Sequence, residues 1–349
     1  MRKSAILLAL LMPCVSARAD VAPIPGTQSV APVFERADLV CNCVVRSLRV
    51  IHQRQLSSAP KAVLRQQVVA NVEVEDEYRS AAPVGRWISV EFWQEIPATL
   101  ASMPSLEKGE RAVMFLSSSA SSRYTFADPF LGAVALHSLP LAPGGQGLKK
   151  LEQALRSVLL LTDREDQVRA LELLGGFDEV APDTIFALLS LTHSADPAVA
   201  LSAFVVLLKT EDAENVNQAD LLANLKIYLD SYPPGAEPAQ LTNIGSELGQ
   251  IRSDKALVGL EAIADCRYVA IRFGALSAIR HIRSPESAPV LIQHLDDSDS
   301  NVRYVAVIAL AEIFQKYGDY APGMGLFDKN PDFYVRLWKN WWAQEGRPR

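Results

Sequence analysis

Two cysteines one residue apart, Cys41 and Cys43, are the side chains in this 349-residue sequence whose type and spacing come closest to a reactive site. Alternate residues of a strand point to the same side, so both thiols are expected beside Leu39 and Val45. Cysteine is among the most frequently buried residue types, which favours two small core side chains. A redox pair and a metal site are the alternatives, although a bridge within a regular strand would require strained geometry.

The other residues that could do chemistry are not arranged for catalysis. The five histidines are scattered along the chain: His52, His137, His193, His281 and His294. The sequence contains no H-E-x-x-H, G-x-S-x-G, P-loop or G-x-G-x-x-G motif. We therefore predict a protein that is not an enzyme and that has no cofactor, no catalytic residues and no metal site.

Two polar clusters have simple structural explanations. The serine-rich run Ser117–Ser122 follows an apolar segment and is expected to form a flexible hairpin loop rather than a nucleophile site. The carboxylates at positions 73, 75, 76 and 77 are expected on the solvated face and end of a strand. Weak binding of Ca²⁺ is the alternative for this second cluster.

The first half of the chain shows the patterns of β-strands. Strands are expected at residues 37–51, 67–77, 86–93 and 112–116, with 124–126 and 131–136 supplying the last pairing. Five or six strands over this length predict a small closed barrel or sandwich, which we assign to residues 33–141. An extended lead-in rich in Pro, Ala and Gly is expected over residues 20–32.

Two motifs in this half, Phe34-Glu-Arg-Ala-Asp38-Leu-Val and Lys108-Gly109-Glu110-Arg-Ala-Val-Met-Phe-Leu, resemble the OB-fold domain of tissue inhibitors of metalloproteinases and netrin-like modules. The resemblance covers roughly residues 33–137 and implies an OB-like barrel. In those inhibitors a Cys-x-Cys at the mature N-terminus binds the protease zinc. Here Cys41-Asn-Cys43 departs from that pattern, because it lies within the first strand, 21 residues beyond the expected mature N-terminus at Asp20. The resemblance implies protease inhibition through the barrel as the alternative function.

The second half repeats with a period of about 33 residues. A Pro- and Gly-rich linker is expected at 142–147, and helical periodicity begins directly after it. Equivalent positions are Val168, Val199, Tyr268, Val302 and Val335. The gap of 69 residues between the second and third is about twice the period, which predicts a degenerate unit at 238–251. Repeats of this size stack into a solenoid, which we assign to residues 148–349.

The best-preserved unit, residues 284–313, is similar to short HEAT repeats of the lyase-like bacterial type. Asp299 is expected to cap the second helix of this unit, and Val302, Ala306, Leu310 and Ile313 are expected to form its buried face. The resemblance covers roughly residues 150–342. It implies helix pairs that bind another protein, or in a third interpretation a lyase-like role on a protein-attached chromophore.

The N-terminus predicts export. A basic start, an apolar run from Ala5 to Met12 and an Ala17-Arg18-Ala19 cleavage pattern indicate a signal peptide over residues 1–19. A lipid anchor on Cys14 is the alternative, and no later run is long enough to span a membrane. Cleavage removes three basic residues, so the net charge falls from −6 to −9, of which −8 lies in residues 149–349. This acidity argues against nucleic acid as a partner.

Three tryptophans near the C-terminus, Trp338, Trp341 and Trp342, lie on one face of an expected helix. They are expected either to cap the last repeat or to bind a partner as aromatic anchors. The sequence as a whole predicts a periplasmic or extracellular adaptor without enzymatic activity, which binds a protein partner through its helical repeats.

Overall fold

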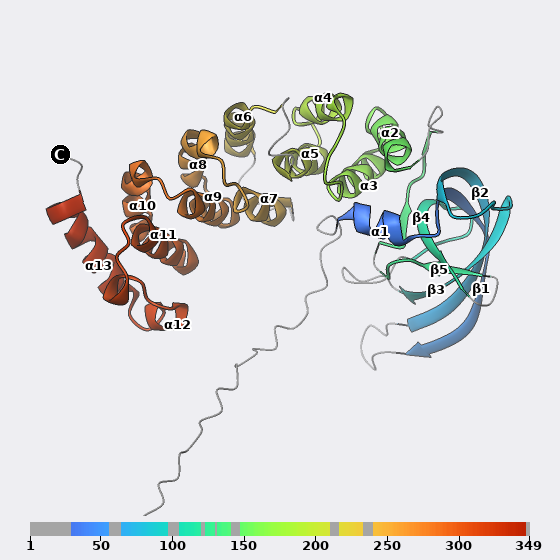
Figure 1. The fold of residues 1–349 in the computed structure, drawn as a ribbon, viewed down its shortest axis with the longest axis horizontal. Coiled ribbons are helices and arrows are strands. Elements are labelled where there is room, and N and C mark those ends of the chain that lie inside the picture. The colour runs from blue at the N-terminus through green and yellow to red at the C-terminus, as the bar shows by residue number, and fades with distance from the viewer. Residues whose placement is uncertain are drawn as a thin grey trace, which may run out of the picture.

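The computed structural model describes residues 29–55, 64–96, 105–119, 123–129, 131–140, 147–209, 216–232 and 240–346. The predicted signal peptide and residues 142–146 of the predicted linker lie outside these ranges. The described chain forms an arch, with a β-barrel at one end and the helices α12 and α13 at the other (Figure 1). The predicted architecture, a small barrel followed by an α-solenoid, is confirmed.

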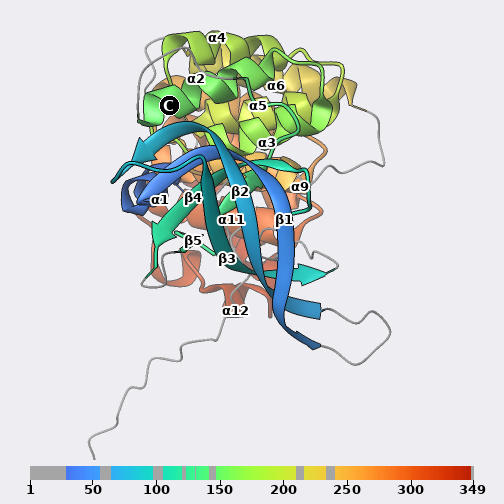
Figure 2. The ribbon, with the colours of Figure 1, turned by 90° about the vertical axis from the view of Figure 1, so that its right-hand side faces the viewer.

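Six strands build the barrel region: β1 (Leu39–Gln55), β2 (Leu64–Ser80), β3 (Trp87–Ile96), β4 (Arg111–Ser118), β5 (Tyr124–Phe126) and β6 (Ala133–Ala135). The first three form an antiparallel meander, β5 pairs parallel to β3, and β4 pairs antiparallel to β5. Strand β4 also pairs with β1, which closes five strands into a barrel (Figure 2). The sixth strand pairs with the start of β4.

The alternation of the strands separates two apolar clusters. Leu39, Cys41 and Cys43 point into the barrel, where they pack with residues such as Val72 and Met114. Val40, Val113 and Phe115 have the opposite parity and point outward, where they join a second cluster that continues into the helices. Tyr78 of β2 joins the same cluster at a register shift, where the strict alternation of β2 is interrupted. The barrel and the helical stack therefore share one continuous core on the outer side of the sheet.

Helix α1 (Val30–Arg36) occupies the end of the predicted lead-in, so the prediction of extended chain is wrong for residues 30–32. The spacing of Val30, Val33 and Phe34 puts three apolar side chains on one helical face, and all three are buried in the shared cluster. Pro32 is tolerated because it lies in the first turn, where no intrahelical N–H bond is required. Burial of these side chains in the tertiary structure thus makes this segment helical, although its composition suggests a loop.

Within the described part of the chain, twelve α-helices follow: α2 (Leu148–Leu159), α3 (Arg164–Leu174), α4 (Pro182–Leu191), α5 (Pro197–Lys209), α6 (Gln218–Ser231), α7 (Gln240–Leu248), α8 (Leu257–Ala264), α9 (Val269–Ile282), α10 (Ala288–Gln293), α11 (Ser300–Ile313), α12 (Met324–Phe327) and α13 (Pro331–Trp341). They alternate between two rows of the arch (Figure 1). The outer row contains α4, α6, α8 and α10, whereas α3, α5, α7, α9 and α11 form the inner row.

Aspartates start several inner helices, as the repeat pattern predicts. The Asp299 carboxylate accepts the N–H groups of Asn301 and Val302 at 2.9 and 3.1 Å, which confirms the expected cap. Asp196 caps α5 in the same way. Helix α7 lies where the degenerate unit was predicted, and its Leu241, Ile244 and Leu248 are buried.

Helices α7 and α9 approach each other closely because a glycine lies on each facing surface. A Cβ atom added to Gly245 would lie 2.3 Å from the carbonyl oxygen of Ala270. One added to Gly274 would lie 2.1 Å from the carbonyl oxygen of Gly245. Real Cβ atoms do not come this close to backbone atoms, so the two glycines set the spacing of the inner row at this point.

Candidate interaction surface

The inner face of the arch carries an exposed apolar pair on α9. This helix packs against α7 and α11 in the inner row and against α8 in the outer row. Its remaining side carries Val269 and Phe273, one helical turn apart, which are 41% and 40% exposed. We call these two residues the α9 stripe. With neighbours on the other three sides, the stripe faces the inside of the arch.

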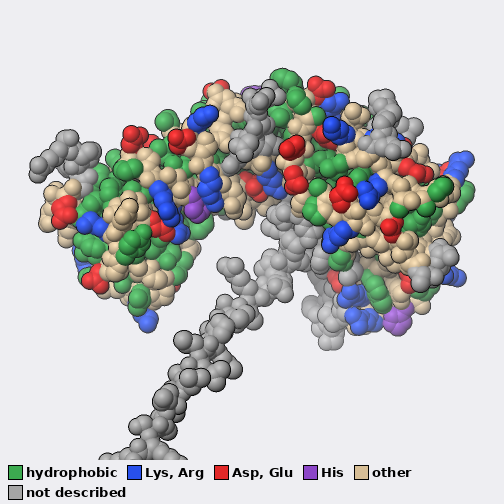
Figure 3. Space-filling model, in the orientation of Figure 1, with side chains coloured by type: hydrophobic (Ala, Val, Ile, Leu, Met, Phe, Trp, Pro, Cys, Tyr) green, Lys and Arg blue, Asp and Glu red, His purple; other side chains and the backbone are tan. Residues whose placement is uncertain are grey.

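Further exposed apolar side chains lie at the C-terminal end of the arch, where Figure 3 shows hydrophobic atoms gathered over the last helices. Met324 and Leu326 of α12 and Phe333 of α13 are 40%, 57% and 43% exposed. Helix α12 is anchored by the ring of Phe327, which packs on Tyr304 of α11 at a centroid distance of 5.4 Å. No motif in the sequence points to these residues or to the α9 stripe.

The three C-terminal tryptophans lie mostly inside the molecule. Trp338 is fully buried and donates its indole N–H to the carbonyl oxygen of Tyr320 at 3.0 Å. Trp341 is 7% exposed and packs on Phe314 at 4.7 Å between ring centroids. Trp342 is half-buried. This placement agrees with a cap on the last repeat, whereas the predicted partner-binding role would depend on Trp342 or on movement of the buried pair.

A buried ion pair joins α9, the helix that carries the stripe, to the loop before α11. Arg272 of α9 donates from Nε and Nη2 to the two carboxylate oxygens of Asp297, at 2.7 and 2.8 Å. Its Nη1 donates to the carbonyl oxygen of Arg267 at 2.8 Å. Burial alone would raise the pKa of Asp297, but the hydrogen bonds and charge of Arg272, together with the N–H of Asp299 and a bond from His294, outweigh burial and hold that pKa below its ordinary value. The pair orients α9 against the next repeat.

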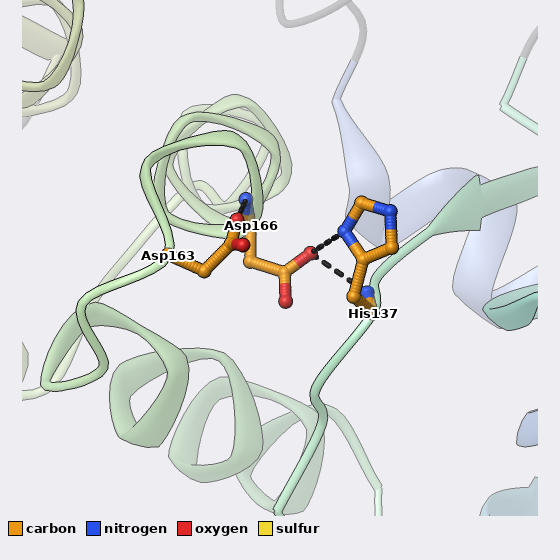
Figure 4. Close-up of side chains that lie close together, drawn as sticks. All are labelled: His137, Asp163 and Asp166. Atoms are coloured by element: carbon orange, nitrogen blue, oxygen red, sulfur yellow. Dashed lines mark hydrogen bonds and ion pairs between the residues drawn. The ribbon is translucent and has the colours of Figure 1, made fainter.

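The ligand atoms of His137, Asp163 and Asp166 lie within 4.8 Å of one another, close enough to share an ion (Figure 4). However, Asp166 is fully buried and already accepts the backbone N–H groups of His137 and Ser138, each at 2.7 Å. Its Oδ1 also lies 3.1 Å from Nδ1 of His137. Asp163 caps α3 by accepting the N–H of Asp166. We therefore interpret the cluster as a clasp between the barrel and the first inner helix.

Both cysteines of the Cys-x-Cys lie inside the barrel with no exposed surface. The expected core position of Cys41 and Cys43 is therefore confirmed. Burial raises the pKa of the Cys41 thiol well above its ordinary value, which makes this thiol unreactive in the folded barrel. From this position neither residue can reach the zinc of a protease, so the inhibitor alternative loses the residues that would perform it.

The acidic cluster on β2 is paired with cations. Glu73 accepts from Nε of Arg46 at 2.8 Å and from Nε of Arg86 at 2.7 Å. These two hydrogen bonds lower the pKa of Glu73, and the bond from Arg86 has the larger effect. Glu75 pairs with Arg111, and Asp76 pairs with Lys150 of α2. Because these carboxylates already have cationic partners, the arrangement is unfavourable for the Ca²⁺ alternative.

Comparison with known proteins supports the helical half. A family model of HEAT repeats matches residues 256–338, from the end of the short turn before α8 into α13. No curated protein matches the chain. Among the described residues, no helix combines the length and apolar character needed to cross a membrane. The resemblance of the barrel to metalloproteinase inhibitors gains no support beyond the closed five-stranded topology. Residues 256–338 are a HEAT-repeat region, an architecture suited to binding proteins.

Proposed function

We propose that this chain is an exported, non-enzymatic adaptor that binds a protein partner along the inner face of its repeats. The observation that carries the proposal is the α9 stripe. Val269 and Phe273 are exposed apolar side chains within the region that matches HEAT repeats. Helix α9 already packs on three sides, so exposed apolar residues on its fourth side add no stability to the fold. Exposed apolar residues of this kind mark a binding surface.

The surroundings of the stripe suggest the chemistry of the partner. The repeat half, residues 149–349, carries a net charge of −8. Further along α9, Arg280 and the adjacent Arg283 share the carboxylate of Glu312 of α11. A partner with an apolar residue for the stripe and a basic rim would match this surface in charge.

The test compares two glutamate substitutions in the full chain. Phe273→Glu places a charge in the stripe, whereas Val258→Glu is a matched control on α8 of the outer row, where the side chain is 76% exposed. Wild-type protein crosslinked in an envelope extract of the source organism supplies the partner, whose affinity for each variant is then measured. We expect Phe273→Glu to weaken binding at least about 30-fold, the effect of losing a contact that contributes about 2 kcal/mol. Val258→Glu should bind as wild type.

Thermal unfolding monitored by circular dichroism must show that both variants are folded. Equal affinity of the two variants for the same partner would remove the stripe from the binding surface and refute the proposal.

A further inference from the structure

The two thiols inside the barrel are unusually close. Sγ of Cys41 lies 2.8 Å from Sγ of Cys43. Heavy atoms that are not bonded normally settle at about 3.5–4.0 Å, whereas a disulfide requires about 2.05 Å. The Sγ–Sγ distance is therefore shorter than a van der Waals contact and longer than a disulfide bond. Both sulfur atoms lie in the apolar interior of the barrel.

The backbone of β1 places the two cysteines within the span of a bridge. Two rises of about 3.2–3.4 Å separate the Cα atoms of residues i and i+2 by at most about 6.8 Å, the upper end of the range found for disulfides. The pairing of β1 with β4 is regular from Leu39 to Val44, and the two register shifts against β2 next to the cysteines leave their extra residues, Tyr78 and Glu75, on β2. The close approach of the sulfur atoms therefore comes from the side chains of Cys41 and Cys43, which point to the same side of the strand.

Neither sulfur has another obvious partner. Cys266, the third described cysteine, is buried in the helical cluster, which is separate from the barrel interior. Among the described residues, the one group of three or more side chains suited to a metal is the His137 clasp, which contains no cysteine. Pairing of Cys41 with Cys43 is therefore favoured over exchange with Cys266 and over metal binding.

We infer that Cys41 and Cys43 form a disulfide when the chain folds in an oxidising compartment. The oxidant is the disulfide of a thiol–disulfide oxidoreductase or of oxidised glutathione. The two thiols lose two protons and two electrons to form the S–S bond, and the oxidant's disulfide is reduced to two thiols. Because the folded barrel covers both sulfur atoms completely, the bond forms before the barrel closes.

The bond lies in the segment that closes the barrel. Cys41 is opposite Met114 and Cys43 is opposite Ala112 in the pairing of β1 with β4. A bridge at this point fixes the backbone of β1 where it pairs with both β2 and β4. Oxidation would thus favour the closed barrel over an open sheet.

The test counts thiols after refolding of the full chain with oxidised and reduced glutathione. The protein is then denatured, alkylated without reductant and digested with trypsin. Cleavage after Arg36 and Arg46 releases Ala37–Arg46, a single peptide that holds both cysteines. We expect this peptide to be two hydrogen masses lighter than its thiol form and to carry no alkyl group. Cys266 is the internal control, because it is also buried in the fold and should be fully alkylated.

Two alkyl groups on Ala37–Arg46, or one glutathione on each cysteine, would overturn the inference. The inference takes its oxidising compartment from the proposed export, and a second arm separates the two. The same peptide is analysed from protein alkylated directly in cells. A bridge after refolding with free thiols in cells would refute export and still support the cysteine pairing.

Discussion

The contact between α7 and α9 allows a direct test of the packing, because a single added methyl group would not fit between the two helices. Gly274→Ala would place a Cβ atom 2.1, 2.8 and 2.9 Å from the O, C and Cα atoms of Gly245. These are backbone atoms of a neighbouring helix, so relief requires the helices to separate by about 1 Å, and overpacking of this kind costs about 1–3 kcal/mol or more. The higher helix propensity of alanine offsets at most about 1 kcal/mol of this destabilisation.

We therefore expect Gly274→Ala to lower the free energy of unfolding by about 2 kcal/mol. Urea denaturation monitored by circular dichroism measures this difference. Gly325→Ala in α12 is the matched control, because an added Cβ there meets no atom within 4 Å. It should leave stability unchanged or raise it by up to about 1 kcal/mol. A Gly274→Ala variant as stable as wild type would show that the close contact between α7 and α9 does not exist.

Three further substitutions test the Arg272–Asp297 ion pair and the C-terminal cap. Asp297→Ala leaves the Arg272 guanidinium buried without its partner, so we expect a loss of about 3–5 kcal/mol at neutral pH in urea unfolding. Because the pKa of Asp297 is lowered in the fold, the pair stabilises the protein above the unfolded value of about 4 and stops doing so as the pH falls through the folded pKa. The difference between wild type and Asp297→Ala should therefore shrink in acid; a constant difference from pH 7 to pH 3 would contradict the assigned ion pair. Trp338→Ala should cost about 3–5 kcal/mol as a buried cap residue, and Trp342→Ala about 1 kcal/mol; the opposite order in thermal unfolding would show that the cap is wrongly assigned.

The sequence predicts local elements well where their periodicity is strong. Alternation in β2 and the apolar run in β4 are visible in single segments, and the period of about 33 residues locates α7 despite its degenerate sequence. Asp299 can be recognised as a cap because capping depends on residues two and three positions away. Interactions of this range can be inferred from the order of residues alone.

Features that depend on distant pairs escape the same reasoning. The clasp joins Asp166 to His137 and Ser138, and no motif links these residues. Helix α1 forms because Val30 and Phe34 are buried against later helices. The α9 stripe looks like any apolar helical spacing in the sequence, and only the positions of α7, α8 and α11 show that Val269 and Phe273 remain uncovered.

The shared core also determines how binding must be studied. Helix α2 packs against β2, Lys150 bonds to Asp76 and to the carbonyl oxygen of Glu77, and the N–H of Val30 bonds to the carbonyl oxygen of Gly176. A solenoid cut free at Leu148 would lose these partners and expose apolar side chains that the barrel and α1 normally cover. Such a fragment would bind other proteins through the cut surface, whatever the inner face does. Point substitutions in the full chain keep the shared core intact, so a loss of binding in Phe273→Glu and its retention in Val258→Glu can be assigned to the inner face alone.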